Sequence, residues 1–150
     1  MVVNLEHTKL ILMRDFRILG DYQIDPDGAV NVDGRVTHMA NQKRLWIRFG
    51  RVTGNWSSYY RGLTNLDGLP QEIDGHVTVT YYPQMGGLLR LLVAKKGVSL
   101  QSTTYRDPTV DRDRQRIGAI LDRFAGQGEA GAFECGAELA AAGYKRHARW

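Results

Sequence analysis

The segment Gly34-Arg35-Val36-Thr37-His38-Met39 sets a pattern that returns as Gly54-Asn55-Trp56-Ser57-Ser58-Tyr59 and as Gly75-His76-Val77-Thr78-Val79-Thr80. Each copy has a glycine, one further residue and an apolar residue that begins a strand-like run. Lys96-Gly97-Val98-Ser99-Leu100 is a looser fourth copy, and the glycines follow one another at intervals of 20, 21 and 22 residues. Leucine-rich-repeat solenoids have periods in this range, and each of their units adds one strand to a parallel sheet. The alternative is a chance recurrence of short Gly-x-Val elements.

Apolar residues recur between the copies, where the chain should climb from one layer of the solenoid to the next. The run from Leu88 to Val93 is almost wholly apolar, which is typical of a layer covered on both sides. We therefore expect another element to pack over the last repeat. The other residues expected to point inward are Leu45, Ile47 and Phe49 in the first interval, and Leu63, Leu66, Leu69 and Ile73 in the second.

The segment before the repeats predicts a β-hairpin. Residues 21–24 and 29–32 flank Asp25-Pro26-Asp27-Gly28, in which proline fixes φ at one turn position and glycine tolerates the positive φ that closes the turn. This hairpin should cap the N-terminal edge of the solenoid. Within residues 1–20, charges interrupt the apolar positions, and periodicity does not distinguish strand from helix.

Two helices are predicted after the repeats. Asp107-Pro108 supplies an N-cap and a proline at the first helical position, and the glycines at 126 and 128 should end the helix. The second helix, Glu129–Ala142, should present mostly small residues on its buried face. Together the two helices should cover the layer Leu88–Val93. The expected covering stripe consists of Ile117, Leu121, Phe124 and Phe133.

These elements predict a single α+β domain over residues 1–150. It should be a short leucine-rich-repeat-like β-solenoid with an N-terminal β-hairpin cap and a C-terminal helical-hairpin cap. Residues 1–34 would form the lead-in and hairpin, residues 35–106 the degenerate repeats, and residues 107–150 the helical cap with a basic tail. A chain of 150 residues is long enough to bury one hydrophobic core.

Composition favours the cytoplasm. Cys135 is the single cysteine, which excludes an intrachain disulfide and fits a reducing compartment. The apolar run near the N-terminus has no cationic segment before it and no small-residue cleavage site after it, so a secretion signal is not expected. No stretch approaches the length of a membrane span. The net charge of +4 does not by itself indicate nucleic-acid binding.

Three segments carry a resemblance to a known family. They are Asp21–Gly34, the run Leu63-Thr64-Asn65-Leu66-Asp67-Gly68-Leu69-Pro70-Gln71-Glu72-Ile73-Asp74-Gly75, and the closing part from Ile120 to Tyr144. They resemble a largely uncharacterised group of tailed-bacteriophage proteins whose short leucine-rich-like repeat reads roughly L-T-x-L-x-G-x-P-x-x-[IV]-x-G. The central run matches that repeat at every defined position. The resemblance spans about residues 16–150 and implies a capped solenoid, a phage origin and residence in the host cytoplasm, with packaging in the virion left open.

The chain departs from the pattern of that group in one respect. The repeat usually places an asparagine five residues after the inward apolar residue, where its amide forms a ladder with neighbouring backbone. Asn41 fits this position after Val36, but Arg61 and Tyr82 occupy it in the next two copies. The sequence therefore does not support a continuous asparagine ladder.

The candidate motifs for catalysis or cofactor binding lack the surrounding elements or ligand residues that their chemistry needs. Gly126-x-Gly128-x-x-Gly131 spells a dinucleotide fingerprint, but it follows a predicted helix instead of a strand, so a helix-hairpin turn is favoured. The acidic residues of the Asp25–Asp33 segment lack the glutamate that closes a calcium loop. The four histidines are far apart, and no Cys/His pair has zinc spacing. Cys135 lies in an alanine-rich helix and is expected to fill the core instead of acting as a nucleophile. We predict a non-enzymatic protein with no cofactor and no metal site.

The outer face of the predicted sheet is the best candidate for function. If the apolar residue of each copy points inward, alternation places its neighbours outward in three rows. His38 and Ser58 are polar residues in the inward phase, so a register shifted by one residue is an alternative. Arginine and tyrosine among hydroxyls and amides are typical of an interface, with an ordinary solvated face as the alternative. The predicted protein-binding residues are Arg35, Asn55 and His76, then Thr37, Ser57 and Thr78, then Met39, Tyr59 and Thr80.

The leading hypothesis is therefore a protein–protein interaction module of phage origin that binds an unidentified host or phage protein through this face, without a membrane. The alternative is a nucleic-acid-associated protein that uses its basic C-terminal helices and tail, with Tyr144 and Trp150 as stacking groups. A solvated basic tail is the simpler explanation of the same residues. The nucleic-acid-binding candidates are Lys145, Arg146, Arg149 and Trp150, supported by Lys95, Lys96, Arg112, Arg114 and Arg116.

Overall fold

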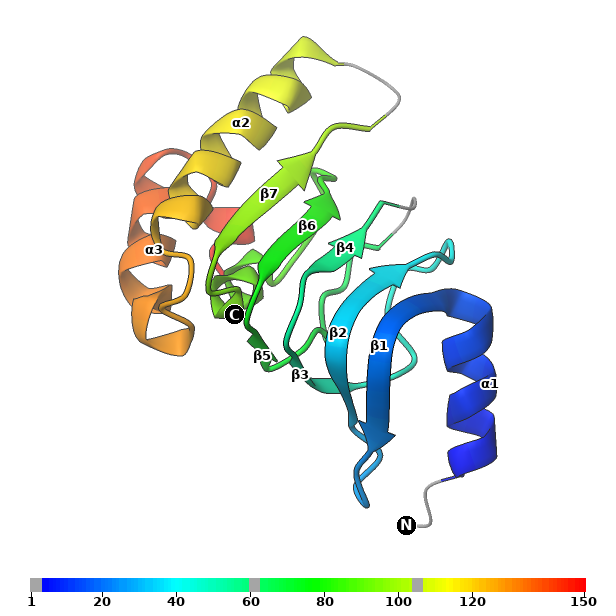
Figure 1. Cartoon of the computed structure of the whole chain (residues 1–150). Coiled ribbons are helices and arrows are strands. Elements are labelled where there is room, and N and C mark those ends of the chain that lie inside the picture. The colour runs from blue at the N-terminus through cyan, green and yellow to red at the C-terminus, as the bar shows by residue number, and fades with distance from the viewer. Residues whose placement is uncertain (1–3, 60–62, 104–106) are drawn as a thin grey trace.

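The computed structural model describes residues 4–59, 63–103 and 107–150. It is an α+β protein with a seven-stranded, mainly parallel sheet that coils as a β-solenoid, with one helix beside the first strand and two helices at the other end (Figure 1). This agrees with the predicted α+β solenoid. The elements are α1 (Leu5–Asp15), β1 (Phe16–Ile24), β2 (Val30–His38), β3 (Phe49–Val52), β4 (Trp56–Ser58), β5 (Glu72–Ile73), β6 (His76–Thr80), the 3-10 helix η1 (Leu88–Val93), β7 (Gly97–Gln101), α2 (Pro108–Arg123), α3 (Glu129–Ala141) and the 3-10 helix η2 (Lys145–His147).

The parallel strands form two branches that meet at β2. The first half of β2 pairs with β3, which pairs with β5, and the second half pairs with β4, followed by β6 and β7. The register aligns Val36, Trp56, Val77 and Val98 across the second branch, and all four side chains are buried. The predicted inward row is therefore correct, and the register shifted by one residue is excluded.

Glycine recurs in the sequence because consecutive coils meet backbone to backbone at the bend between the branches. The amide of Gly54 donates to the carbonyl oxygen of Gly34 at 2.8 Å, and the amide of Gly75 donates to that of Gly54 at 3.1 Å. A Cβ on Gly54 would lie 2.6 Å from the Gly34 oxygen, which leaves no space for a side chain. The fourth copy differs, because the register pairs Gly97 with His76 and Val98 with Val77, so its glycine lies one position later than in the other copies.

Side chains cap these bends, although not at the position expected from the phage repeat. The Oδ1 atoms of Asn31 and Asn55 accept from backbone amides of the next coil at 2.9 and 2.8 Å. At the last coil Asp122 of α2 accepts from the amide of Val98 at 2.8 Å. Asn41, which fits the expected ladder position, is exposed.

The N-terminal hairpin is longer than predicted. β1 pairs antiparallel with β2 from Phe16 opposite His38 to Ile24 opposite Val30, so the second hairpin strand and the first repeat strand are one strand. The unassigned lead-in forms α1, which Asn4 caps by accepting from the amide of His7, and then the start of β1.

The C-terminal helices cover the last coil as predicted, with one exception. Asp107 caps α2 by accepting from the amides of its first turn, and Ile117 and Leu121 are fully buried. Phe133 is 87% exposed, so its predicted place in the covering stripe is wrong. The buried residues of α3 are Gly131, Cys135 and Leu139. Phe133 lies two positions after Gly131, about 200° around the helix, and therefore points away from this face.

One hydrophobic core runs through the coils. At its N-terminal end Phe49 contacts Phe16 and Trp56 edge to face, with ring centroids 5.1 and 4.9 Å apart. Toward the C-terminal end leucines replace the aromatic rings, and η1 supplies four of them. The predicted inward residues are buried, apart from the half-buried Val93: they are Leu45, Ile47, Leu63, Leu66, Leu69, Ile73, Leu88, Leu89, Leu91 and Leu92.

Candidate functional site

A groove of about 380 Å³ crosses the outer face of the sheet. It extends over β1, β2, β4 and β6, and most of its side chains alternate with the buried row. The residues that line it are Arg17, Leu19, Arg35, Val36, Thr37, Asn55, Ser57, Tyr59, His76 and Thr78.

Seven of the nine predicted protein-binding residues line this groove: Arg35, Thr37, Asn55, Ser57, Tyr59, His76 and Thr78. Met39 is exposed just beyond the end of β2 and does not line it. Thr80 pairs with Gln101 and keeps the outward phase, but its side chain is buried, so its predicted place on an exposed row is wrong. The sequence prediction missed Arg17 and Leu19 because β1 was unassigned there. The antiparallel register places them opposite Thr37 and Arg35.

A row of hydroxyl groups crosses the groove. Thr37, Ser57 and Thr78 are direct neighbours across β2, β4 and β6, and adjacent strands lie about 4.8 Å apart. Within the described residues, none of these three hydroxyls has a hydrogen-bond partner. Each can therefore both donate to and accept from a bound ligand.

The groove carries positive charge. Arg17 and Arg35 are exposed, and none of the described residues that line the groove is an aspartate or a glutamate. Over residues 4–59, 63–103 and 107–150, neither arginine lies within ion-pair distance of a carboxylate. Seven other arginines do form such pairs: Arg14, Arg48, Arg51, Arg90, Arg112, Arg114 and Arg123.

Asn55 and His76 have structural tasks that fix one side of the groove. The Oδ1 atom of Asn55 accepts from the amide of His76, which leaves the Asn55 NH₂ group for a ligand. The ring of His76 lies over Gly97, where a Cβ would be 2.7 Å from Nδ1. Its Nε2 atom is 2.8 Å from the hydroxyl oxygen of Ser99. Both side chains are therefore held by the sheet itself.

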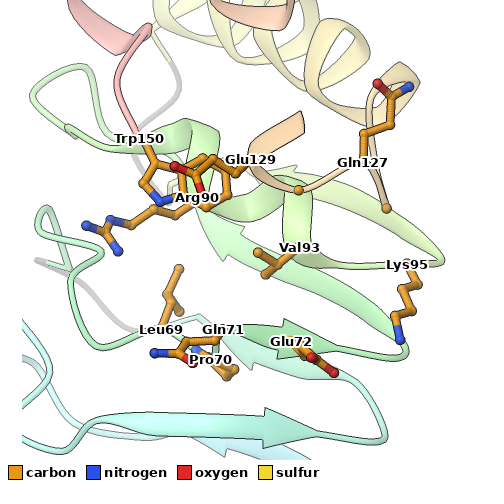
Figure 2. Close-up of a pocket in the computed structure, with 12 residues that line it drawn as sticks. Leu69, Pro70, Gln71, Glu72, Arg90, Val93, Lys95, Gln127, Glu129 and Trp150 are labelled. Carbon is orange, nitrogen blue, oxygen red and sulfur yellow. The ribbon is translucent and has the colours of Figure 1, made fainter. Parts of the chain in front are cut away.

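A second cavity, of about 560 Å³, lies between the solenoid and the C-terminal segment (Figure 2). Four segments that are distant in sequence form it, which is why periodicity gave no sign of it. Its charges have both signs and are partly engaged, since Lys95 binds Asp74 at 2.8 Å and Arg90 binds Asp67 at 3.3 Å. Its lining residues include Leu69, Pro70, Gln71, Glu72, Val93, Gln127, Glu129 and Trp150.

The C-terminal tail is packed against the solenoid. His147 is fully buried, with Nδ1 donating to the carbonyl oxygen of Met85 at 2.8 Å and Nε2 2.9 Å from the Tyr81 hydroxyl oxygen. Tyr144 is 5% exposed and donates to Asp113, so its predicted use as a stacking group is wrong. The other tail candidates, Lys145, Arg146, Arg149 and Trp150, remain exposed.

A polar chain, buried except at the half-buried Gln42, connects α1, β2 and β4. Gln42 Nε2 donates to Asp15 at 2.9 Å, and Gln42 Oε1 lies 3.0 Å from His38 Nε2. Because an amide oxygen only accepts, His38 donates from Nε2 and its Nδ1 accepts from the Ser58 hydroxyl at 3.0 Å. This order of groups resembles that of a catalytic serine and its base. Ser58 is only 1% exposed and lines none of the cavities described here, so a substrate has no access to it.

Two further observations bear on catalysis and on metal binding. Burial raises the pKa of the Cys135 thiol to about 11, so this cysteine stays protonated near neutral pH. In the part of the chain that the structure describes, no three residues among His, Cys, Asp and Glu come together as a possible metal site.

No protein-family model, curated protein or solved structure matches this chain. The resemblance to phage proteins therefore stays a prediction. Among the described helices, none has the length and apolar character needed to cross a bilayer.

Proposed function

We propose that this protein is a non-enzymatic interaction module that binds a segment of another protein in the groove on the outer face of its sheet. The observation that carries the proposal is the free hydrogen-bonding capacity of this groove: three hydroxyls in register and two arginines that have, among the described residues, neither a hydrogen-bond partner nor a counter-ion.

The groove is rigid where a partner would bind. Backbone bonds between consecutive coils and the cap of Asn55 fix the strands beneath it. A preorganised surface loses little conformational entropy on binding, which favours affinity. Tyr59 is 55% exposed at the groove, and tyrosine and arginine are the side chains most often responsible for binding energy at interfaces.

The size of the groove favours a peptide segment as the bound part. Protein–protein interfaces of standard size bury about 800 Å² on each partner. A groove that crosses only four strands offers a smaller surface than that. An extended segment could place alternate side chains in it.

The leucine-rich-repeat-like character of the solenoid is also part of this proposal. The buried leucines Leu63, Leu66 and Leu69 of the run that matches the phage repeat support a leucine-rich-repeat-like solenoid. We also propose that the protein is of phage origin and acts in the host cytoplasm, so its partner would be a host or phage protein.

The experiment that tests the function is selection from a display library of random linear peptides. Thr78→Tyr should fill the groove without changing the charge, and Gln101→Tyr is the matched control, because Gln101 is exposed on β7 outside the groove. We expect selected peptides to bind the wild type and Gln101→Tyr but not Thr78→Tyr. Peptides that bind all three proteins equally would place the binding site elsewhere and refute the proposal. Thermal melting of each variant confirms that its fold is intact.

Nucleic-acid binding is the second candidate, supported by the exposed cluster Lys145, Arg146 and Arg149. A titration of single-stranded DNA at increasing salt distinguishes it. The candidate requires affinity that falls steeply with salt and that is lost on substitution of these three residues by glutamine.

A further inference from the structure

We infer that the groove selects an acidic segment, with carboxylates of the partner bound by Arg17 and Arg35. This inference rests on the proposed function and names the chemistry of the partner.

The register brings the two arginines together. Arg17 on β1 is opposite Thr37 on β2, and Arg35 lies two positions before Thr37, on the same face. Such diagonal neighbours lie about 7–8 Å apart. The two positive side chains therefore start from neighbouring positions on one face of the sheet, where a carboxylate of a partner can bind both.

The part of the chain that the structure describes supplies no such carboxylate. Elsewhere on the sheet Arg51 is flanked by Asp74 at 2.7 Å and Glu72 at 3.7 Å. The groove arginines have no ion-pair partner among the described residues and are available to one from outside. A guanidinium binds a carboxylate through two parallel hydrogen bonds, and the Thr37 hydroxyl beside Arg17 can donate a further one.

The neighbouring charges limit how much negative charge the partner can bring. Asp21 and Asp33 are opposite each other on the same two strands, in phase with the arginines and two positions beyond Leu19 and Arg35. A nucleic-acid backbone carries a phosphate at every nucleotide, and one running along the strands would meet these carboxylates. A short acidic segment can place its charge at the arginines alone. This arrangement favours a protein segment with one or two carboxylates over a polyanion.

The test compares two double variants of the full chain. Arg17→Gln/Arg35→Gln removes the groove charges, and Lys43→Gln/Arg44→Gln removes the same number from exposed residues between β2 and β3, outside the groove. Both start from the net charge of +4, so non-specific attraction falls equally. The probes are the peptides selected on the wild type and, separately, single-stranded oligothymidylate, with affinities measured by fluorescence anisotropy at physiological salt.

We expect the selected peptides to be rich in aspartate and glutamate. They should bind Arg17→Gln/Arg35→Gln at least about tenfold more weakly than the wild type and bind the control variant within about twofold. Equal losses in both double variants would reduce the effect to net charge and overturn the inference. Oligothymidylate that binds more tightly than any peptide, with the same dependence on Arg17 and Arg35, would replace the acidic segment by a nucleic acid.

Failure of this inference is distinguishable from failure of the proposed function. Peptides that are neutral or basic, insensitive to Arg17→Gln/Arg35→Gln and still lost on Thr78→Tyr would overturn the acidic preference and leave the groove as the binding site. If no selected peptide depends on Thr78, both are refuted.

Discussion

The two ends of the solenoid are closed by different means. At the C-terminal end α2 lies along β7 (Figure 1) and α3 packs against η1, and Ile117, Leu121 and Leu139 are fully buried there. At the N-terminal end the closing elements are β1, an added antiparallel strand, and α1. Ile11 and Leu12 of α1 are buried, but Leu10 and Met13 are 65% and 80% exposed. The C-terminal end is thus closed by apolar burial, and the N-terminal end mainly by strand pairing.

A buried histidine fastens each end. His38 connects Ser58 of β4 to Gln42 and, through it, to Asp15 at the end of α1. His147 connects η2 to Tyr81 and to the carbonyl of Met85. Since His38 donates from Nε2 and His147 from Nδ1, the two rings are held in opposite neutral tautomers. Polar contacts of a buried histidine are thus common to the two ends, whereas the amount of apolar burial differs between them.

The largest expected effect comes from removing the helices at each end in turn. A chain that ends at Ser102 exposes the leucines of η1 and the edge of β7, and we expect it to aggregate. A chain that begins at Arg14 keeps Asp15 and β1, and we expect it to stay soluble and monomeric. Size-exclusion chromatography with light scattering measures both. A soluble monomer for the first chain and aggregation of the second would reverse the comparison.

The next effect compares one leucine at each end. Leu121→Ala should lower the free energy of unfolding by about 4–5 kcal/mol, because helices and strands enclose the cavity it leaves. Leu12→Ala should lower it by about 2 kcal/mol, because α1 packs on one side only and can settle into the space. Urea denaturation measures both values. Equal losses would mean that the two ends are equally well packed.

The histidines predict a dependence of stability on pH. Burial is the main cause that lowers the pKa of His38 and of His147 below the usual value, so the unfolded chain binds protons more readily than the folded one. Stability is then fully present above about pH 6.5 and is lost as the pH falls from there through the lowered pKa values, by up to about 1.4 kcal/mol per pH unit for each histidine.

Urea denaturation between about pH 7.5 and pH 5 tests this dependence in the wild type, His38→Gln and His147→Gln. Each substitution should flatten the profile, and the double variant should flatten it further. A wild-type profile that is level over this range, or that rises toward acid, contradicts the expected sign.

The smallest effect is expected at the exposed apolar residues of the two ends. Met13→Ser and Phe133→Ser should each change the free energy of unfolding by no more than about 0.5 kcal/mol, because both side chains are mostly in contact with solvent. A loss above about 2 kcal/mol for Phe133→Ser would mean that Phe133 is buried and belongs to the covering stripe. Thermal melts of the two variants are sufficient to decide.

Much of the candidate site was predictable, because alternation along a strand is a local property. Once Val36, Trp56 and Val77 were assigned inward, their neighbours had to line the outer face, and seven of the nine predicted residues line the groove. Arg17 was not predictable, because the lead-in has no clear period and its place depends on pairing with β2. The burial of Thr80 and Tyr144 likewise depends on segments that pack against them from elsewhere in the chain.

The sequence by itself determined the solenoid, its period and its inward row, because backbone stacking at the bends demands glycine at a fixed interval and burial demands an apolar residue next to it. It also determined the two C-terminal helices through their caps. Only the tertiary structure decided which face of α3 is buried, which ring nitrogen of His38 and of His147 donates a hydrogen bond, and that two arginines from different strands share one groove in which no described lining residue is a carboxylate. Those features depend on contacts between distant segments, and no local pattern of residues encodes the distance between two side chains that meet only after folding.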